Sequence, residues 1–367
     1  MSIMTTDPTK TVKLFFCYAR EDKALRDELE QHLSLLKRQK QITTWYDREI
    51  SPGSEWKQEI DTHLNSAHII LLLVSPDFLA SDYCFGIEMK RALERHEAGT
   101  ARVIPIILRS VYWKGAPFSN LQVLPTDALP VTSWPDRDRA FLDITENIHK
   151  AVEEIQLSLL ANEWLEEGNA LGEHKRYEEA LVAYDQAIHL DSNFAPAYHN
   201  KGNALNELKR YEEALAAYER AIRLDPNDAI AYSNKGMALY GLKQYEEALA
   251  DYEQAIRLDP NFADAYHNKG NALHGLKRYE EALVAYDQAI RLDPNFADAY
   301  SNKGMVLNEL KRYEEALAAC EQAIRLDPNF AYAYHNKGVA LERLGRNKDA
   351  QQAFERARQL GYKGLAV

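Results

Sequence analysis

Short, mostly apolar runs alternate with amphipathic stretches through the first 160 residues. The runs are rich in branched and aromatic side chains, which is typical of strands buried on both faces of a sheet. They predict five strands, at Val12–Cys17, Ile42–Tyr46, Ile69–Val74, Val103–Leu108 and Val131–Trp134. The stretches between them predict helices at Asp22–Lys37, at Glu55–Asn65, from Ser81 onward and at Asp138–Leu160. Strands that alternate with helices in this way indicate a parallel sheet covered on both faces.

The carboxyl ends of the predicted strands carry several polar side chains. In open parallel sheets, ligands bind beyond these ends, where the strand order switches direction. The residues there are Tyr18, Arg20 and Asp22, then the segment 47–53, then Ser75. Strand-end packing and a surface charge explain Tyr18 and Arg20 as well as ligand contacts do. Ser75 is better explained as the end of a strand than as part of a site.

Glu88 lies on the helix that is predicted to follow the third strand. Helical spacing places it beside the apolar stripe, at the margin between that stripe and water. A carboxylate at this margin is either a surface ion-pair partner, with Arg91 or Arg95, or a working group over the edge of the sheet. From the residues alone, the ion pair is the better explanation.

The second half of the chain repeats itself every 34 residues. Glycines recur at 168, 202, 236, 270, 304 and 338, and alanines at 180, 214, 248, 282, 316 and 350. Each unit holds two amphipathic stretches joined by a short turn such as Leu-Lys-Arg-Tyr, which predicts a pair of helices. Stacked pairs form a superhelix in which the first helices line a concave face.

One asparagine of each unit, from the second to the sixth, falls on the expected concave face: Asn200, Asn234, Asn268, Asn302 and Asn336. Histidine and serine alternate at the position before it. This polar ladder could hold an extended peptide. The alternative, which we favour slightly, is that the asparagines only bridge adjacent helices in recently duplicated units.

Composition and charge exclude several classes of protein. Residues 1–160 hold 19 Lys and Arg against 23 Asp and Glu, and residues 161–367 hold 25 against 33, so we expect no nucleic-acid partner. Cys17, Cys84 and Cys320 show no metal-ligand spacing, and buried packing explains the first two better than a reactive thiol. The N-terminus lacks an apolar signal segment, and no apolar run is long enough for a membrane span. These features predict a cytoplasmic protein without a bound metal.

Three segments of the first half carry a family resemblance. Phe15 to Asp22 (FFCYARED), Trp45 to Gly53 and Ser81 to Glu88 (SDYCFGIE) resemble, in order and spacing, the signatures of the Toll/interleukin receptor (TIR) domain. Cys17 and Tyr83 stand where the family usually has serine and tryptophan. Glu88 also lies five residues past this aromatic position, where the plant and animal pattern has four. The resemblance implies a flavodoxin-like α/β fold with a five-stranded parallel sheet.

The same resemblance implies a site and an activity. Many TIR domains cleave the nicotinamide–ribose bond of NAD⁺, with the glutamate that matches Glu88 as the catalytic residue. NAD⁺ is then the substrate, and no cofactor is expected. The residues expected to contact it are Tyr18, Arg20, Asp47, Tyr83 and Cys84. Pro52 and Gly53 belong to the loop that gates the site or mediates TIR–TIR contacts in the family, although they are equally explained as a simple turn.

The 34-residue units resemble the tetratricopeptide (TPR) repeat at nearly every consensus position. We therefore expect a mobile N-terminus at 1–11, a TIR domain at 12–160, six TPR repeats forming an all-α superhelix at 161–364 and a tail at 365–367. The resulting prediction is an NAD⁺ nucleosidase or ADP-ribosyl cyclase of bacterial stress or phage-defence signalling, which its repeats regulate or assemble through a protein or peptide ligand. The alternative is a signalling adaptor without activity, using only TIR–TIR and TPR–partner contacts.

Overall fold

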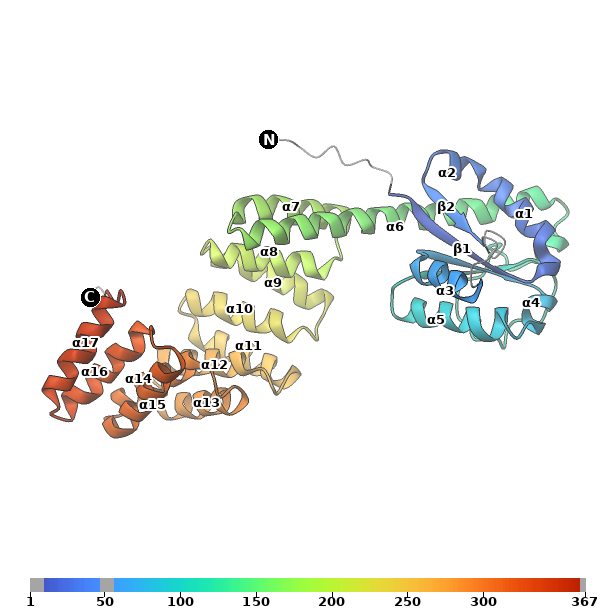
Figure 1. The fold of residues 1–367 in the computed structure, drawn as a ribbon. Coiled ribbons are helices and arrows are strands. Elements are labelled where there is room, and N and C mark those ends of the chain that lie inside the picture. The colour runs from blue at the N-terminus through green and yellow to red at the C-terminus, as the bar shows by residue number, and fades with distance from the viewer. Residues whose placement is uncertain (1–9, 47–55, 364–367) are drawn as a thin grey trace. The chain divides into compact units, whose positions relative to one another are not determined.

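The computed structural model describes residues 10–46 and 56–363, and Figure 1 shows its elements. The chain divides into two compact units, Met1–Asn162 and Glu163–Val367. One helix, α6 (Arg137–Glu173), contributes residues to both units and begins one residue before the predicted start at Asp138. The first unit is an α/β layer structure and the second consists of helices, which confirms the predicted fold class.

The sheet of the first unit has four parallel strands in the described residues, in the order β2–β1–β3–β4. Their bounds are β1 (Val12–Tyr18), β2 (Ile42–Trp45), β3 (Ile69–Val74) and β4 (Arg102–Ile107). The registers pair Phe16 with Leu71 and Leu71 with Ile104. After β1 the chain enters β2 at one edge of the sheet, and after β3 it enters β4 at the other edge. The switch in strand order therefore lies between β1 and β3.

The prediction of a fifth strand at Val131–Trp134 is wrong. Val131–Ser133 forms a short 3-10 turn, and a single β-bridge joins Leu124 to Ile106 at the β4 edge. Pro130 and Pro135 flank these four residues, and each lacks the backbone N–H that a strand needs for its ladder. A run this short between two prolines cannot extend into a strand.

Two hydrophobic cores cover the two faces of the sheet, and strand parity decides which side chain enters which core. Leu14, Phe16 and Tyr18 of β1 face one core, whereas Phe15 and Cys17 face the other. Figure 1 shows α1 and α2 on one side of the sheet and α3 and α5 on the other. The helices of the first face are α1 (Lys23–His32), α2 (Ser34–Arg38) and α6; those of the second are α3 (Trp56–Ser66), α4 (Pro76–Ala80) and α5 (Met89–Glu97).

After β3 the chain forms three short helical elements, whereas the sequence predicted one helix from Ser81 onward. A short helix, α4, begins at Pro76, and the Ser75 side chain caps it by accepting a hydrogen bond from the Phe78 backbone N–H at 3.0 Å. Ser75 therefore starts a helix as well as ending a strand. A wide π-helical turn, η3 (Cys84–Glu88), then leads into α5. The predicted helix at Asp22–Lys37 is likewise split at Leu33 into α1 and α2.

The second unit is a series of helix pairs. After the end of α6 its helices are α7 (Tyr177–Leu190), α8 (Ala195–Glu207), α9 (Tyr211–Leu224), α10 (Ala229–Gly241), α11 (Tyr245–Leu258), α12 (Ala263–Gly275), α13 (Tyr279–Leu292), α14 (Ala297–Glu309), α15 (Tyr313–Leu326), α16 (Ala331–Arg343) and α17 (Asn347–Gln359). Gly202 shows why the repeated glycine is needed: a Cβ there would come within 2.6 Å of the Tyr218 ring. Contact of this kind closes each pair.

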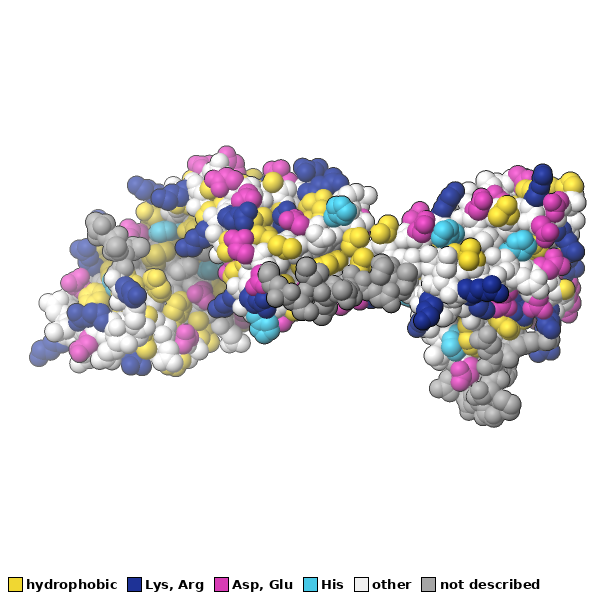
Figure 2. Space-filling model, turned by 90° about the horizontal axis from the view of Figure 1, so that it is seen from above, with side chains coloured by type: hydrophobic (Ala, Val, Ile, Leu, Met, Phe, Trp, Pro, Cys, Tyr) yellow, Lys and Arg dark blue, Asp and Glu magenta, His cyan; other side chains and the backbone are white. Residues whose placement is uncertain are grey.

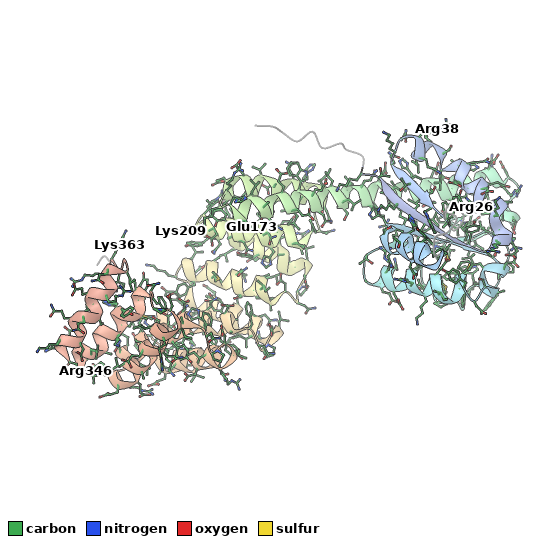
Figure 3. All side chains as sticks on the ribbon, in the orientation of Figure 1. Arg26, Arg38, Glu173, Lys209, Arg346 and Lys363 are labelled. Carbon is green, nitrogen blue, oxygen red and sulfur yellow. The ribbon has the colours of Figure 1, made fainter. Side chains whose placement is uncertain are left out.

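The turn inside each pair has a left-handed residue, as helix C-termini often do. In the second pair this residue is Lys209, at φ 59°, and the next backbone N–H, of Arg210, bonds to the carbonyl of Leu205 at 2.9 Å. Lys209 marks this turn in Figure 3. On the face drawn in Figure 2, acidic and basic side chains are interleaved over both units, as expected for solvated surfaces.

Candidate functional site

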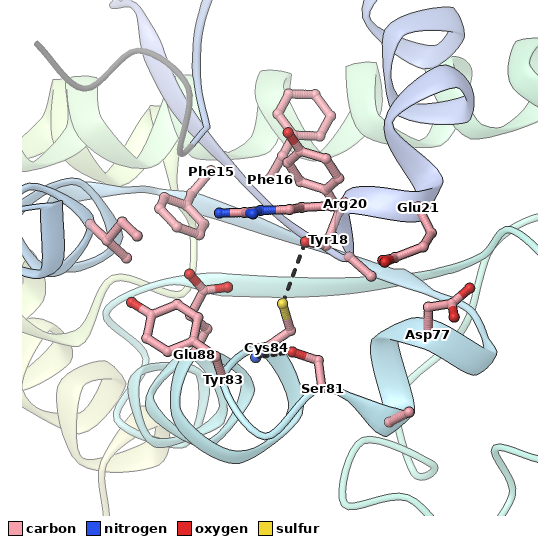
Figure 4. A pocket seen from close by; sticks show the side chains of 13 residues that line it. Phe15, Phe16, Tyr18, Arg20, Glu21, Asp77, Ser81, Tyr83, Cys84 and Glu88 are labelled. Atoms are coloured by element: carbon pink, nitrogen blue, oxygen red, sulfur yellow. Dashed lines mark hydrogen bonds between the residues drawn. The ribbon is translucent and has the colours of Figure 1, made fainter. Parts of the chain in front are cut away.

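A cavity of about 660 Å³ lies at the carboxyl ends of β1 and β3, where the strand order switches. Residues at the end of β1 form one side of it, and the segment from Asp77 to Glu88 forms the other. Figure 4 shows Tyr18 and Arg20 across the cavity from Tyr83, Cys84 and Glu88. The fold therefore brings five residues that the sequence predicted for the site to one cavity: Tyr18, Arg20, Tyr83, Cys84 and Glu88.

Glu88 is buried, with only 5 % of its surface exposed, and lines this cavity. The expectation that it lies at the margin between the helix stripe and water is therefore wrong. The surface ion pair that would explain it is also not formed: Arg91 pairs with Asp61 at 2.8 Å, and Arg95 donates to the backbone carbonyls of Leu64 and Thr100. The carboxylate instead accepts a hydrogen bond from the Cys17 thiol, with 2.8 Å between Sγ and Oε2.

The π-helical turn explains the five-residue spacing between Tyr83 and Glu88. In this turn the backbone N–H of Glu88 bonds to the carbonyl of Tyr83, at 3.1 Å, and that of Met89 bonds to Cys84. A π turn accommodates one more residue than an α turn. It therefore returns Glu88 to the face of the helix that Tyr83 occupies, as a four-residue spacing does in an α-helix. We infer that the extra residue leaves the carboxylate aimed at the site.

The two thiols of the first unit connect this turn to β1. The Cys84 Sγ donates to the Tyr18 carbonyl at 3.4 Å, a bond drawn in Figure 4, and the Cys17 Sγ reaches Glu88. Burial, together with Cys84 and the Glu88 charge, raises the pKa of Cys17 well above its usual value, so this thiol keeps its proton at neutral pH. The sequence predicted buried packing for both thiols, and the structure adds polar contacts that it did not suggest.

The other expected substrate contacts differ in their positions. Arg20 is exposed and lines the cavity. Tyr18 borders the cavity at the strand end, but its ring faces the opposite core and lies 5.2 Å from the Arg26 guanidinium. Tyr83 lines the cavity, where burial and the nearby Glu88 charge raise the pKa of its hydroxyl. Asp47, Pro52 and Gly53 lie outside the described residues.

Sequence reasoning missed a charged network at the rim of the same cavity. Asp22 is almost fully buried and accepts hydrogen bonds from the Ser75 hydroxyl and from Arg109 Nε, the latter at 2.8 Å. Arg109 also donates to Asp77, which lines the cavity. The network ties the chain after β1, after β3 and after β4 together. Asp22 and Ser75 stood out as strand-end residues, but nothing in the sequence connected them to Arg109.

The asparagine ladder of the second unit joins neighbouring helices to one another. Asn200 donates to Asn169 at 2.7 Å, and Asn234 donates to Asn203 at 2.9 Å, one repeat back in each case. Asn302 bonds to Asn271 in the same way, and Asn336 donates to Ser301. For Asn268 the matching position is Met237, which offers no oxygen acceptor. The bridging alternative thus describes four of the five asparagines, and a ligand role for them is left without direct support.

Residues 10–46 and 56–363 contain no group of three or more His, Cys, Asp or Glu side chains arranged to hold a metal ion. Within the same part of the chain, no helix has both the length and the apolar character that crossing a bilayer requires.

Comparison with known proteins identifies both units. A TIR domain family model matches residues 14–160, and tetratricopeptide repeat models match segments from 168 to 352. A curated relative, Uncharacterized protein y4lF of Sinorhizobium fredii (strain NBRC 101917 / NGR234), is 54 % identical over 138 residues. That match covers 38 % of this chain and 43 % of the relative, so the chain spans less than half of the relative's length.

Solved structures resemble the helical unit. PilF of Pseudomonas aeruginosa is 18 % identical with a TM-score of 0.51, over 57 % of this chain and 95 % of PilF. YrrB, described as a TPR protein with an unusual peptide-binding site, is 28 % identical with a TM-score of 0.41, over 50 % of this chain and 94 % of YrrB. The first of these shows the fold alone. The family models show that the chain is a TIR-domain protein with C-terminal TPR repeats, and the fold agrees with them.

Proposed function

We propose that the TIR domain is an NAD⁺ nucleosidase that cleaves the bond between nicotinamide and ribose, with Glu88 as its catalytic residue. The observation that carries this proposal is the position of Glu88: a buried carboxylate, held by a thiol donor, in the wall of a cavity at the switch in strand order. A buried ionisable side chain in a cavity is typical of catalytic sites, which favours the enzyme over the adaptor.

Cleavage of the nicotinamide–ribose bond can be catalysed by a single carboxylate. Nicotinamide leaves the pyridinium form of NAD⁺ as a neutral molecule, so that no general acid is required. The ribose becomes positively charged at C1′ as the bond breaks, and a preorganised anion stabilises that charge. Glu88 supplies this anion from a buried position, where water screens its charge less than at the surface.

The remaining cavity residues have roles that fit the rest of the dinucleotide. Arg20, exposed at the mouth, carries the positive charge that a pyrophosphate would contact. The Tyr83 ring lies one turn before Glu88 and presents an aromatic surface for a base or the nicotinamide. Capture of C1′ by water gives ADP-ribose, and capture by another nucleophile of the substrate gives a cyclic ADP-ribose.

The TPR array is proposed as the assembly or regulatory part of the protein, through a protein or peptide partner and TIR–TIR association in a bacterial signalling or defence pathway. Solenoids of this kind present extended surfaces for partners. The support is the fold itself, because the hydrogen bonds described for the asparagine ladder join neighbouring repeats. Cleavage measured across a protein concentration series, with full-length protein and with residues 1–162, tests this part: identical specific activities would remove it.

The enzymatic proposal is tested by incubating the purified full-length protein with NAD⁺ and separating nicotinamide, ADP-ribose and cyclic products by chromatography. We expect nicotinamide to appear in step with loss of NAD⁺. Absence of nicotinamide at every protein concentration, with a folded TIR domain, would favour the adaptor instead.

A further inference from the structure

The Cys17 thiol lies at the centre of the contacts that fix Glu88. Cys17 is fully buried on β1, on the strand face that packs against α5. Its Sγ is 2.8 Å from Glu88 Oε2 and 3.8 Å from the carbonyl of Cys84, the first residue of the π turn. Cys84 in turn donates its own thiol to the Tyr18 carbonyl of β1. The two thiols therefore form a reciprocal pair of contacts between β1 and the turn that carries the carboxylate.

A glutamate side chain has three rotatable bonds, so burial alone does not fix where its oxygens lie. A polar contact from a rigid element does. β1 is such an element, because it is an inner strand paired on both sides, to β2 and to β3. A hydrogen bond from Cys17 therefore fixes the position of the Glu88 carboxylate relative to the sheet. A buried apolar residue there would fill the space without orienting Glu88.

The direction of this hydrogen bond is settled by chemistry. Burial holds the thiol of Cys17 in its protonated form at neutral pH, and an ionised carboxylate can only accept. Among the described residues, Tyr83, Cys84 and Arg20 line the cavity together with Glu88, and Asp61 of α3, which is paired with Arg91, acts on Tyr83.

We propose that Cys17 is a positioning residue for Glu88: its S–H donates to Oε2 and orients the carboxylate toward the cavity in which C1′ of the substrate would lie. The proposal rests on the proposed function for its catalytic consequence, although the contact itself does not depend on turnover. Cys17 touches neither substrate nor reacting atoms, since it does not line the cavity.

This role predicts an order of pKa values for Glu88, because residues of different hydrogen-bond donor strength can be placed at position 17. A hydroxyl is a stronger donor than a thiol, and valine has no donor. A hydrogen bond to the ionised form of a carboxyl lowers its pKa, and loss of the bond raises it. The pKa of Glu88 should therefore be lowest in Cys17→Ser, intermediate in the wild type and highest in Cys17→Val, with about one pH unit between Val and wild type.

The first measurement is the pH profile of kcat/KM for NAD⁺ cleavage by the full-length protein. The acidic limb should move up in pH for Cys17→Val and down for Cys17→Ser. At neutral pH the Val variant should lose about tenfold in kcat with a smaller change in KM, and Ser should restore it. Cys320→Ala, which removes a buried thiol from the second unit, should leave the profile unchanged. Profiles that coincide for all three residues at position 17 would overturn the proposal.

The second measurement does not require activity. Carboxyl ¹³C NMR of protein labelled at glutamate, with Glu88→Gln to identify the Glu88 signal, gives the pKa of Glu88 directly in each variant. The order Ser, Cys, Val supports the contact even if the protein proves not to cleave NAD⁺, which separates this proposal from the proposed function. Should Cys17→Val fail to fold, the difference between Ser and wild type remains decisive: no shift, or a shift upward, contradicts the role assigned to the thiol.

Discussion

Arg109 is expected to stabilise the TIR domain more than any ordinary surface arginine would. It lies just after β4 and bonds to Asp22 and Asp77, which follow β1 and β3. The Asp22 side chain is fully buried, whereas Arg109 is 34 % exposed. Arg109→Ala removes the cation and leaves the Asp22 carboxylate in the protein interior with only the Ser75 hydroxyl as its remaining bonded partner among those described here.

The expected size follows from burial. Removing one partner of a fully buried ion pair destabilises a protein by about 3–5 kcal/mol, because the remaining charge is left uncompensated. Arg109 is partly exposed, so water can reach the vacated position. We therefore expect Arg109→Ala to lower the free energy of unfolding by about 2–3 kcal/mol. Arg102, the first residue of β4, offers a matched control. It pairs with Glu154 at 2.6 Å, but both side chains are exposed, by 42 % and 62 %, so Arg102→Ala should change stability by at most about 1 kcal/mol.

Urea unfolding followed by tryptophan fluorescence can report on this domain within the full-length protein. Four of the five tryptophans precede residue 162, and a Trp164→Phe background removes the fifth. The midpoint of the fluorescence transition should fall clearly for Arg109→Ala and hardly at all for Arg102→Ala. If the two variants lose the same stability, the network around Asp22 does not hold the rim of the cavity and the reasoning is wrong.

Three further predictions concern other parts of the chain. Deleting Gly86 should convert the π turn to an α turn and leave a folded TIR domain that still cleaves NAD⁺, whereas one extra glycine beside it should abolish cleavage; nicotinamide release measures both. Asn203→Leu removes the acceptor for Tyr218 and Asn234, so it should lower repeat stability by about 2 kcal/mol in circular dichroism melts, and Met237→Leu, at the equivalent position, should not. Burial raises the pKa of Asp251, so the charged form disfavours the fold, and Asp251→Ala should stabilise the repeats at pH 7 with a gain that shrinks as the pH falls toward 4.

Much of the fold was readable because its periodicities are strong. The four described strands and the repeat helices have apolar patterns that match their burial, and the 34-residue period is uninterrupted from Gly168 to Gly338. The prediction of a strand at Val131–Trp134 was wrong because β-branched and aromatic residues favour strands, whereas the two flanking prolines cannot donate to a strand ladder. The break of the first helix at Leu33 followed no breaker residue and could not be read from the sequence.

The site was less readable, since its decisive features depend on backbone geometry. Glu88 was found by its motif, but its burial was not, because helical spacing was counted with an α period through a π turn. The contact between Cys17 and Glu88 joins residues 71 positions apart, and that between Asp22 and Arg109 joins residues 87 apart. Only the strand order brings such residues together.

The most direct test of the central claim is a comparison of NAD⁺ cleavage by Glu88→Gln and Glu94→Gln. Glu94 is exposed on α5, the helix that follows directly from the π turn, so its replacement controls for a general effect of losing a charge there. Loss of one preorganised electrostatic group should reduce kcat/KM of Glu88→Gln by at least about a hundredfold, with thermal stability almost unchanged. Glu94→Gln should cleave NAD⁺ at the wild-type rate. Wild-type turnover by Glu88→Gln would contradict the mechanism.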